Sequence, residues 1–362
     1  MAAIHSTGLF SIRFLLLSLL VTPLRAIFNW PRITQVRRLL GLAALAYAVA
    51  HLVLYADDQK WQLLTVVSEI TLRFYLTIGF VALLGLAVLG VTSTDAWLRR
   101  LGARWKRLHR IAYGIGALAA FHFFLQSKAD VSEASLMAGL LVWLMAWRAL
   151  PAGPDRQPLP LLLLAGASAL GTVGIELAWY ALATRVPVSR VIAAESTIDW
   201  YGLQPGGQIL VLGLCMALAA TLAWAQQRRR LQETAAFHIA LYLAGGLMAS
   251  ATAFAFGLDA DSDAPAWIAP AIWGALLAML GLARWQLPTE RRGLLDILVA
   301  GCLGYLLVSL GVDSHPAMLA ASAALILSAL AMSVRFWPVS RASALLLLPT
   351  TLWIGYATAI MP

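Results

Sequence analysis

The sequence has few charged residues and almost no cysteine. Charged side chains make up 12% of its 362 residues, against 61% hydrophobic ones. This is too little polar surface for a soluble protein of this length, so the chain is expected to cross a membrane several times. The two cysteines, Cys215 and Cys302, lie in apolar segments and match no metal or disulfide spacing, which is typical of packing residues.

Other absences narrow the possible functions. No polar segment is long enough to form a nucleotide-binding domain, and no nucleophile, acid–base pair or hydrolytic motif stands out. The net charge of +9 comes from arginines clustered between the apolar segments, a pattern typical of membrane topology and not of nucleic-acid binding. The apolar runs are continuous, which excludes a barrel of alternating strands.

The apolar segments predict an all-α polytopic membrane protein with about twelve transmembrane helices. The predicted spans are 8–28, 38–56, 70–91, 108–126, 134–150, 159–183, 207–225, 235–257, 266–284, 293–311, 315–334 and 342–361. Their connections alternate between basic and neutral or acidic, so the positive-inside rule puts the basic set in the cytoplasm and both termini outside. One exception is the long connection 184–205, predicted outside although it holds Arg185 and Arg190.

Three of the six histidines lie in or beside apolar segments between Arg37 and Lys128. His51 and His122 are near the outer ends of two predicted helices that run in the same direction, because one helix lies between them. Ionisable residues inside a membrane are costly and often mark functional sites. The pair is therefore predicted to be the two axial ligands of a b-type haem; the alternative is a pair of hydrogen-bonded packing residues.

His109 lies at the inner end of the predicted helix that carries His122, about 20 Å away along an α-helix. A second haem at that depth needs a ligand opposite His109, and the matching position on the earlier helix is Arg37. Two interpretations stay open. His109 is either a ligand of a second haem or an interfacial histidine between Arg107 and Arg110.

A resemblance to a known protein family rests on three motifs, which are RRLLGLAALAYAVAHLVLY, LAVLGVTST and LGARWKRLHRIAYGIGALAAFHF. Through them, residues 8 to about 150 resemble the MsrQ (YedZ) family, the haem-containing membrane subunit of the periplasmic methionine sulfoxide reductase system, within the ferric-reductase-like superfamily. The resemblance implies metal ligation by His51 and His122, a haem-associated and metal-binding role for His109, and a place in the bacterial inner membrane.

The resemblance also implies a function. Electrons from a cytoplasmic-side quinol or flavin would pass through haem b to a periplasmic MsrP-like reductase, so the chain would be an electron-transfer subunit of an oxidoreductase system. Arg107, in the basic cluster beside His109, is a candidate to bind an anionic flavin or haem propionates, and Arg73 is a second candidate. Membrane topology alone also explains these arginines.

Residues 235–362 resemble a second family, the tryptophan-rich sensory proteins (TspO/MBR), which have five membrane helices. The matching stretches are APAWIAPAIWGALLAMLGLARW and LLLPTTLWIGYATA, in which Trp267, Trp273 and Trp353 occupy motif positions. The resemblance implies binding or transport of a tetrapyrrole such as a porphyrin, or of a lipid-like ligand. The alternative is a belt of tryptophans at the membrane interface.

The two resemblances predict the domain organisation. A ferric-reductase-like haem bundle occupies residues 1–150, a linker with a two-helix extension occupies 151–232, and a TspO-like five-helix bundle occupies 233–362. The linker begins with the proline-rich stretch 151–160, which cannot be helical throughout.

Overall fold

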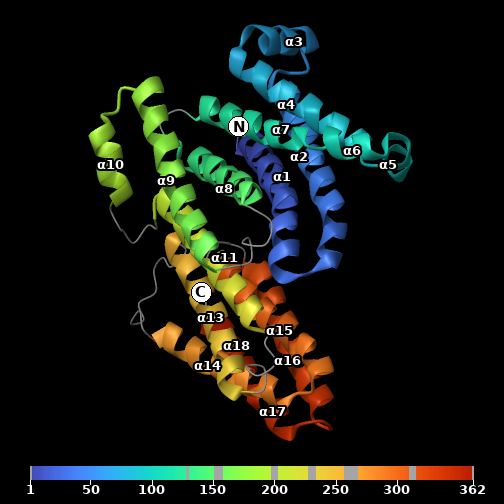
Figure 1. The fold of residues 1–362 in the computed structure, drawn as a ribbon, viewed down its shortest axis with the longest axis vertical. Helices are drawn as coiled ribbons and strands as arrows, with labels where there is room; N and C mark the ends of the chain where they lie inside the picture. Colours follow the sequence, from blue (N-terminus) through green and yellow to red (C-terminus); the bar gives the residue numbers. More distant parts are fainter. Residues whose placement is uncertain are drawn as a thin grey trace. The chain divides into compact units, whose positions relative to one another are not determined.

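The computed structural model describes residues 2–127, 130–150, 158–196, 203–226, 234–256, 268–309 and 315–360. Within these ranges the chain is helical and contains no strand (Figure 1). The expected all-α fold of a polytopic membrane protein is therefore confirmed.

Each of the twelve predicted spans corresponds to a helical segment of the structure. These are α1 (Ala2–Phe28), α2 (Val36–Asp58), α4 (Phe74–Val91), α7 (Ile111–Gln126), α8 (Ser132–Ala149), α9 (Pro158–Ala183), α11 (Pro205–Gln226), α13 (Ala235–Ala255), α14 (Ile268–Gln286), α15 (Thr289–Ser309), α16 (His315–Phe336), and α17 (Arg341–Leu346) with α18 (Leu348–Ile360). Among the described residues, eight segments are long and apolar enough to cross a membrane; α8, α14, α15 and α17–α18 fall short of that criterion.

Shorter helices lie between the long ones. They are η1 (Pro31–Gln35), α3 (Leu63–Leu72), α5 (Asp95–Leu101), α6 (Ala103–Leu108) and α10 (Val188–Ser196). The predicted span 70–91 begins later than expected, at Phe74, because Arg73 is extended (φ −102°, ψ 106°) and separates α3 from α4. The connection 184–205 contains a helix of its own, α10.

Local sequence explains the break between α5 and α6. The Thr94 hydroxyl accepts a hydrogen bond from the Trp97 N–H, and Asp95 lies in the first turn, so α5 begins with a capped, acidic N-terminus. Gly102 separates the two helices with φ +51°, a left-handed value that favours glycine. Arg38 of α2 forms an ion pair of 3.0 Å with Asp95, which ties α5 to the start of α2.

The described chain falls into two compact units. Unit 1 comprises Met1–Ser196 with Gln204–Gly213, and unit 2 comprises Thr197–Leu203 with Leu214–Pro362. In unit 1, α1 packs along α2, α2 against α4, α4 against α7, and α7 against α1. These four helices form a closed bundle with α2 and α7 at opposite corners, and α8 covers α1 and α7.

Two contacts illustrate how unit 1 is held together. Ala44 of α2 is fully buried, and its carbonyl accepts a hydrogen bond of 2.9 Å from the Ser11 hydroxyl of α1. Gly139 of α8 faces α9 so closely that a Cβ placed on it would meet the Thr172 side chain. Small residues thus let neighbouring helices approach, as is common between membrane helices.

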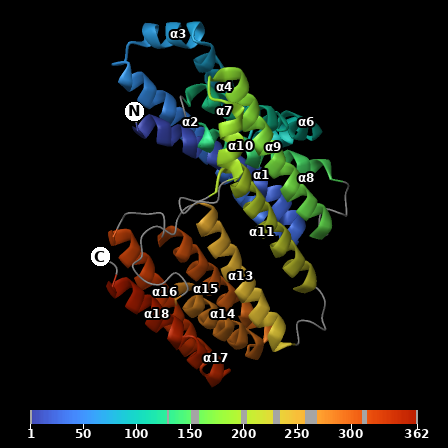
Figure 2. The ribbon, with the colours of Figure 1, turned by 90° about the vertical axis from the view of Figure 1, so that its left-hand side faces the viewer.

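In unit 2, helices α13 to α18 form a second bundle (Figure 2). Helix α14 packs against α13, α15 and α17, and α16 packs against α15, α17 and α18. The core of unit 2 is built mainly from aliphatic side chains, such as Leu277, Leu280, Leu295 and Ile354. Phe336, Tyr242 and Cys302 also belong to it, and all its members are below a tenth exposed.

The closest backbone approach in unit 2 generates a prediction. A Cβ on Gly281 of α14 would lie 2.6 Å from the Ile239 Cα and 2.7 Å from the His238 carbonyl oxygen, both in the backbone of α13. Gly281→Ala should therefore force α13 and α14 apart and lower the free energy of unfolding by about 1–3 kcal/mol. Thermal unfolding of the detergent-solubilised protein measures this.

Gly274→Ala is the matched control. Gly274 lies on the same helix, and a Cβ there would meet nothing within 4 Å. It should leave the melting temperature unchanged or raise it slightly, since alanine favours a helix over glycine by about 1 kcal/mol. An equal loss of stability in both variants would contradict the close approach.

Candidate functional site

His51 lies on α2 and is bound to the neighbouring helix α1. Its Nδ1 is 2.7 Å from the carbonyl oxygen of Ile4. One turn further along α1 is Gly8, where an added Cβ would lie 3.1 Å from Cε1 and Nδ1 of the imidazole. The absence of a side chain at Gly8 therefore lets the ring reach the backbone of α1.

His122 lies on α7 and makes the corresponding contact with α4. Its Nδ1 is 2.8 Å from the carbonyl oxygen of Tyr75. One turn later is Gly79, where an added Cβ would lie 2.7 Å from the imidazole Cε1 and 3.0 Å from Nε2. No larger residue fits at Gly79 without moving the ring.

The two arrangements repeat with a constant spacing. Carbonyl, glycine and histidine stand at positions 4, 8 and 51 in the first set and at 75, 79 and 122 in the second, a shift of 71 residues for each member. The helix pair α1–α2 is thus matched by the pair α4–α7. The carbonyl positions hold isoleucine and tyrosine, so within each set the sequence repeats only the glycine and the histidine.

Hydrogen bonding fixes the protonation of both rings. A carbonyl oxygen can only accept, so Nδ1 must carry the proton in each histidine and Nε2 keeps its lone pair. Metal-ligating histidines typically have their second nitrogen held in this way. Both rings are half-buried and lie on helices at opposite corners of one bundle.

Two such imidazoles suit a metal ion whose remaining ligands come from a macrocycle. Haem in a helix bundle is commonly held in this way, by residues of facing helices. Among the described residues, no group of three or more histidine, cysteine or carboxylate side chains could hold a bare metal ion. The residues present therefore fit a bis-histidine haem.

His109 has a different environment. It lies between α6 and α7, and its Nε2 is 3.2 Å from the Thr92 hydroxyl. That hydroxyl donates to the Val88 carbonyl at 2.7 Å, so Nε2 of His109 is the donor. The Trp105 ring stacks on the imidazole at 3.8 Å, and its indole N–H donates to the Thr92 carbonyl at 2.8 Å. In His109 the hydrogen-bonded nitrogen is Nε2, whereas in His51 and His122 it is Nδ1.

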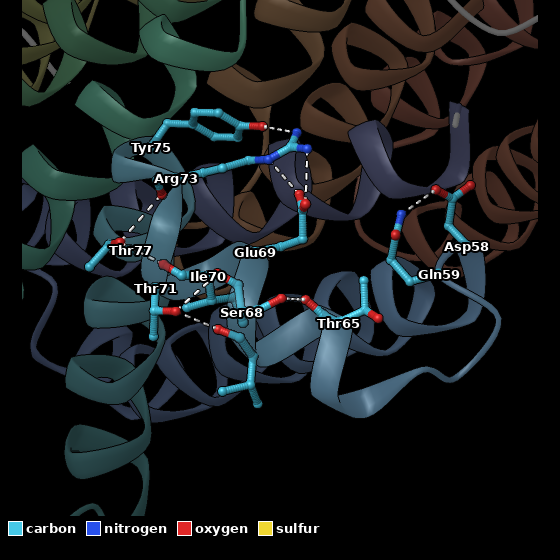
Figure 3. Close-up of polar contacts among 11 residues, drawn as sticks. Asp58, Gln59, Thr65, Ser68, Glu69, Ile70, Thr71, Arg73, Tyr75 and Thr77 are labelled. Carbon is cyan, nitrogen blue, oxygen red and sulfur yellow. Dashed lines mark hydrogen bonds and ion pairs between the residues drawn. The ribbon is translucent and has the colours of Figure 1, made fainter.

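Neither candidate arginine takes part in the hydrogen bonds of the histidine pair, but Arg73 contacts Tyr75, whose carbonyl accepts from His122. Figure 3 shows the Arg73 guanidinium between Glu69 and Tyr75; it donates to the Glu69 carboxylate at 3.0 Å and to the Tyr75 hydroxyl at 3.1 Å. Part of its charge is therefore neutralised within the chain. Arg107 is exposed on α6, two residues before His109.

The candidate tryptophans of unit 2 have separate surroundings. Trp273 on α14 is half-buried and packs against the core of the unit, and Trp353 on α18 has a ring contact of 5.8 Å with Tyr356. Trp267 lies outside the described residues.

Sequence reasoning missed two polar groups. In unit 2, Arg284 stands at the end of the predicted span 266–284. It is 4% exposed and donates to both oxygens of Asp296, at 2.7 and 3.0 Å. His238 and Tyr242 complete this group, through contacts of 2.6 Å to Arg284 and 2.7 Å to Asp296 respectively. In unit 1, Glu176 is a buried acid within a membrane span; an ionisable residue in an apolar run is a signal that could have found it.

Comparison with known proteins supports both resemblances. Residues 7–120 match the family described as ferric reductase like transmembrane component, and residues 260–361 match the TspO/MBR family. No solved structure matches.

Curated relatives match the N-terminal part of the chain. The protein-methionine-sulfoxide reductase heme-binding subunit MsrQ of Xanthomonas oryzae pv. oryzae is 44% identical over 146 residues, which are 40% of this chain and 67% of the relative. MsrQ of Rhizobium meliloti is 42% identical over 148 residues, again 40% and 67% of the two chains. The chain therefore belongs to the MsrQ family, and it carries in addition a C-terminal segment that matches the TspO/MBR family.

Proposed function

We propose that unit 1 is a membrane electron carrier that holds haem b between His51 and His122. The observation that supports this most is the matched pair of hydrogen bonds from Nδ1 to the carbonyls of Ile4 and Tyr75. Bound haem b supplies a reversible one-electron carrier.

In this proposal the chain's own residues orient the ligands and tune their strength. The carbonyls of Ile4 and Tyr75 fix each imidazole and, as hydrogen-bond acceptors, raise the basicity of the free nitrogen. Gly8 and Gly79 permit the close approach that these bonds need. Apolar helices around the pair exclude water, which is one of the means by which a protein sets a haem potential.

The donor and acceptor follow from topology and from the relatives. The positive-inside rule places Arg107 and the other basic residues near His109 on the cytoplasmic side, where we infer that a quinol or an anionic flavin delivers electrons. The relatives are named as subunits of protein-methionine-sulfoxide reductase. We therefore infer a periplasmic MsrP-like partner, methionine sulfoxide repair as the process, and the bacterial inner membrane as the location, with both termini outside.

Our assignment gives His109 a secondary role. A second haem at the inner level would require His109 to give up the hydrogen bond between its Nε2 and Thr92, or to bind through Nδ1. We therefore expect one haem at His51 and His122, and treat His109 and Arg73 as residues near the electron path.

The C-terminal part supports a second candidate function. Residues 260–361 match the TspO/MBR family, so we infer that this part binds a tetrapyrrole or a lipid-like ligand through Trp267, Trp273 and Trp353. We also keep 1–150, 151–232 and 233–362 as the proposed domains, although compact unit 1 extends beyond residue 150.

The histidine assignment predicts a spectroscopic loss. His51→Ala and His122→Ala should each abolish the low-spin haem absorbance of the purified protein, because either change removes one axial ligand. His109→Ala should retain that absorbance. Full haem content and an unchanged spectrum in both of the first two variants would refute the assignment.

The contact between Gly79 and His122 predicts that haem binding can be changed without replacing either histidine. A Cβ on Gly79 would collide with the imidazole of His122, so Gly79→Ala should lower haem occupancy or shift its spectrum. Gly114→Ala on α7 is the control, because Gly114 is exposed and a Cβ there meets nothing within 4 Å. The absorbance spectrum and haem content of each variant decide the question, and indistinguishable variants would count against the contact.

For unit 2, the test is binding of protoporphyrin IX to the full-length protein. A variant with Trp273→Phe and Trp353→Phe should bind the porphyrin more weakly if these residues belong to the site. Absorbance titration measures the affinity. Unchanged affinity would leave the tryptophans as interfacial anchors.

A further inference from the structure

Unpaired buried polar atoms gather in one part of unit 1. Seven buried side-chain nitrogen or oxygen atoms in the described residues lack a hydrogen-bond partner, and six of them belong to α8, α9 and α10. These are Ser135 Oγ, Trp143 Nε1, Trp147 Nε1, Ser168 Oγ, Glu176 Oε2 and Glu195 Oε1. Since buried polar groups are nearly always paired, the two carboxyl oxygens among these atoms point to a protonated acid and not to a carboxylate without a partner.

Two carboxyl groups lie at one end of this region. Glu176 of α9 is 5% exposed, and its carboxyl is hydrogen-bonded to that of Glu195 on α10. The N–H of Gly206, at the start of α11, also donates to Glu195. A Cβ on Gly206 would lie 2.8 Å from the Glu195 Oε2, so the missing side chain lets the backbone come this close.

A hydrogen bond between two carboxyl groups requires a proton. Ionised carboxylates only accept, and two of them in contact repel each other. The Gly206 N–H favours the ionised form of Glu195, so Glu176 is the member that holds the proton and donates. Burial raises the pKa of Glu195, although the hydrogen bonds from Gly206 and Glu176 lower it.

Among the described residues, no lysine, arginine or histidine forms an ion pair with either carboxyl. The groups that act on the pair are Asp130, Tyr180 of α9 and Ser135 of α8. A buried acid without a counter-ion is neutralised by a proton and not by an ion pair.

The pair is linked by packing to the helix that carries His122. Trp179 of α9 lies three residues after Glu176, and its ring contacts Phe124 of α7 at 5.0 Å. Phe124 is buried and stands two residues after His122. A change of charge at the histidine pair thus occurs one helix away from the buried acids.

We propose that Glu176 and Glu195 form a proton-binding site that takes up a proton when the centre held by His51 and His122 is reduced, and releases it on oxidation. This inference rests on the proposed function. An electron added to a low-dielectric interior favours a proton nearby, because the two charges compensate. One electron and one proton enter together, so the net charge of the bundle stays constant.

Two measurements test the proposal on the full-length protein. First, the midpoint potential of the wild-type haem should fall as pH rises, because a proton is taken up on reduction. Glu195→Gln should remove this dependence while the haem spectrum stays unchanged, because Glu195 is the ionised member that receives the proton. Glu133→Gln is the control, since Glu133 is an exposed acid on α8 paired with Arg13, and it should keep the dependence. A potential independent of pH in the wild type, or the same dependence in Glu195→Gln, would overturn the proposal.

Second, infrared spectroscopy reports the shared proton without relying on electron transfer. The protein should show the carbonyl stretch of a protonated carboxyl group in a buried environment, which Glu176→Gln removes. Glu195→Gln should shift that band, because Glu176 loses its carboxylate acceptor, and this variant serves if Glu176→Gln does not fold. A spectrum without the band in the wild type contradicts the proton site. A protein with the band but without haem supports the proton site and contradicts the proposed function instead.

Discussion

The hydrogen bonds from His51 to the Ile4 carbonyl and from His122 to the Tyr75 carbonyl join each candidate ligand to a neighbouring helix. They fix the ring orientation and the tautomer, and both depend on a glycine one turn further along the partner helix. The packing of α1 on α2 and of α4 on α7 therefore determines whether the two nitrogens can act as ligands. The same helix packing is therefore needed both for a stable bundle and for a site that can bind a ligand.

Much of the fold could be predicted because membrane helices can be recognised in a sequence as long apolar runs. His51 and His122 could be predicted as a pair from their depth and helix direction. The backbone partners of these histidines could not be predicted, because every residue has a carbonyl oxygen. Gly8 and Gly79 could not be predicted either, because nothing in the sequence separates them from other glycines of apolar helices. The Glu176–Glu195 contact could not be predicted for another reason: a helix within 184–205 was not expected.

The two units differ in how they accommodate buried polarity. In unit 2, Arg284 and Asp296 compensate each other, with His238 and Tyr242 completing the group. In unit 1, neither buried acid forms an ion pair within the described residues, and we propose that a shared proton relieves their charge. Burial of polar groups in an apolar interior is costly unless it is compensated. Where the compensation is a proton, the site can respond to a change of charge nearby.

The most direct measurement of the central claim is electron paramagnetic resonance of the oxidised, purified full-length protein, combined with haem quantification per chain. Our account predicts a low-spin ferric signal typical of two imidazole ligands, at one haem b per chain. A high-spin signal from a five-coordinate haem, or a folded protein that contains no haem, would contradict it.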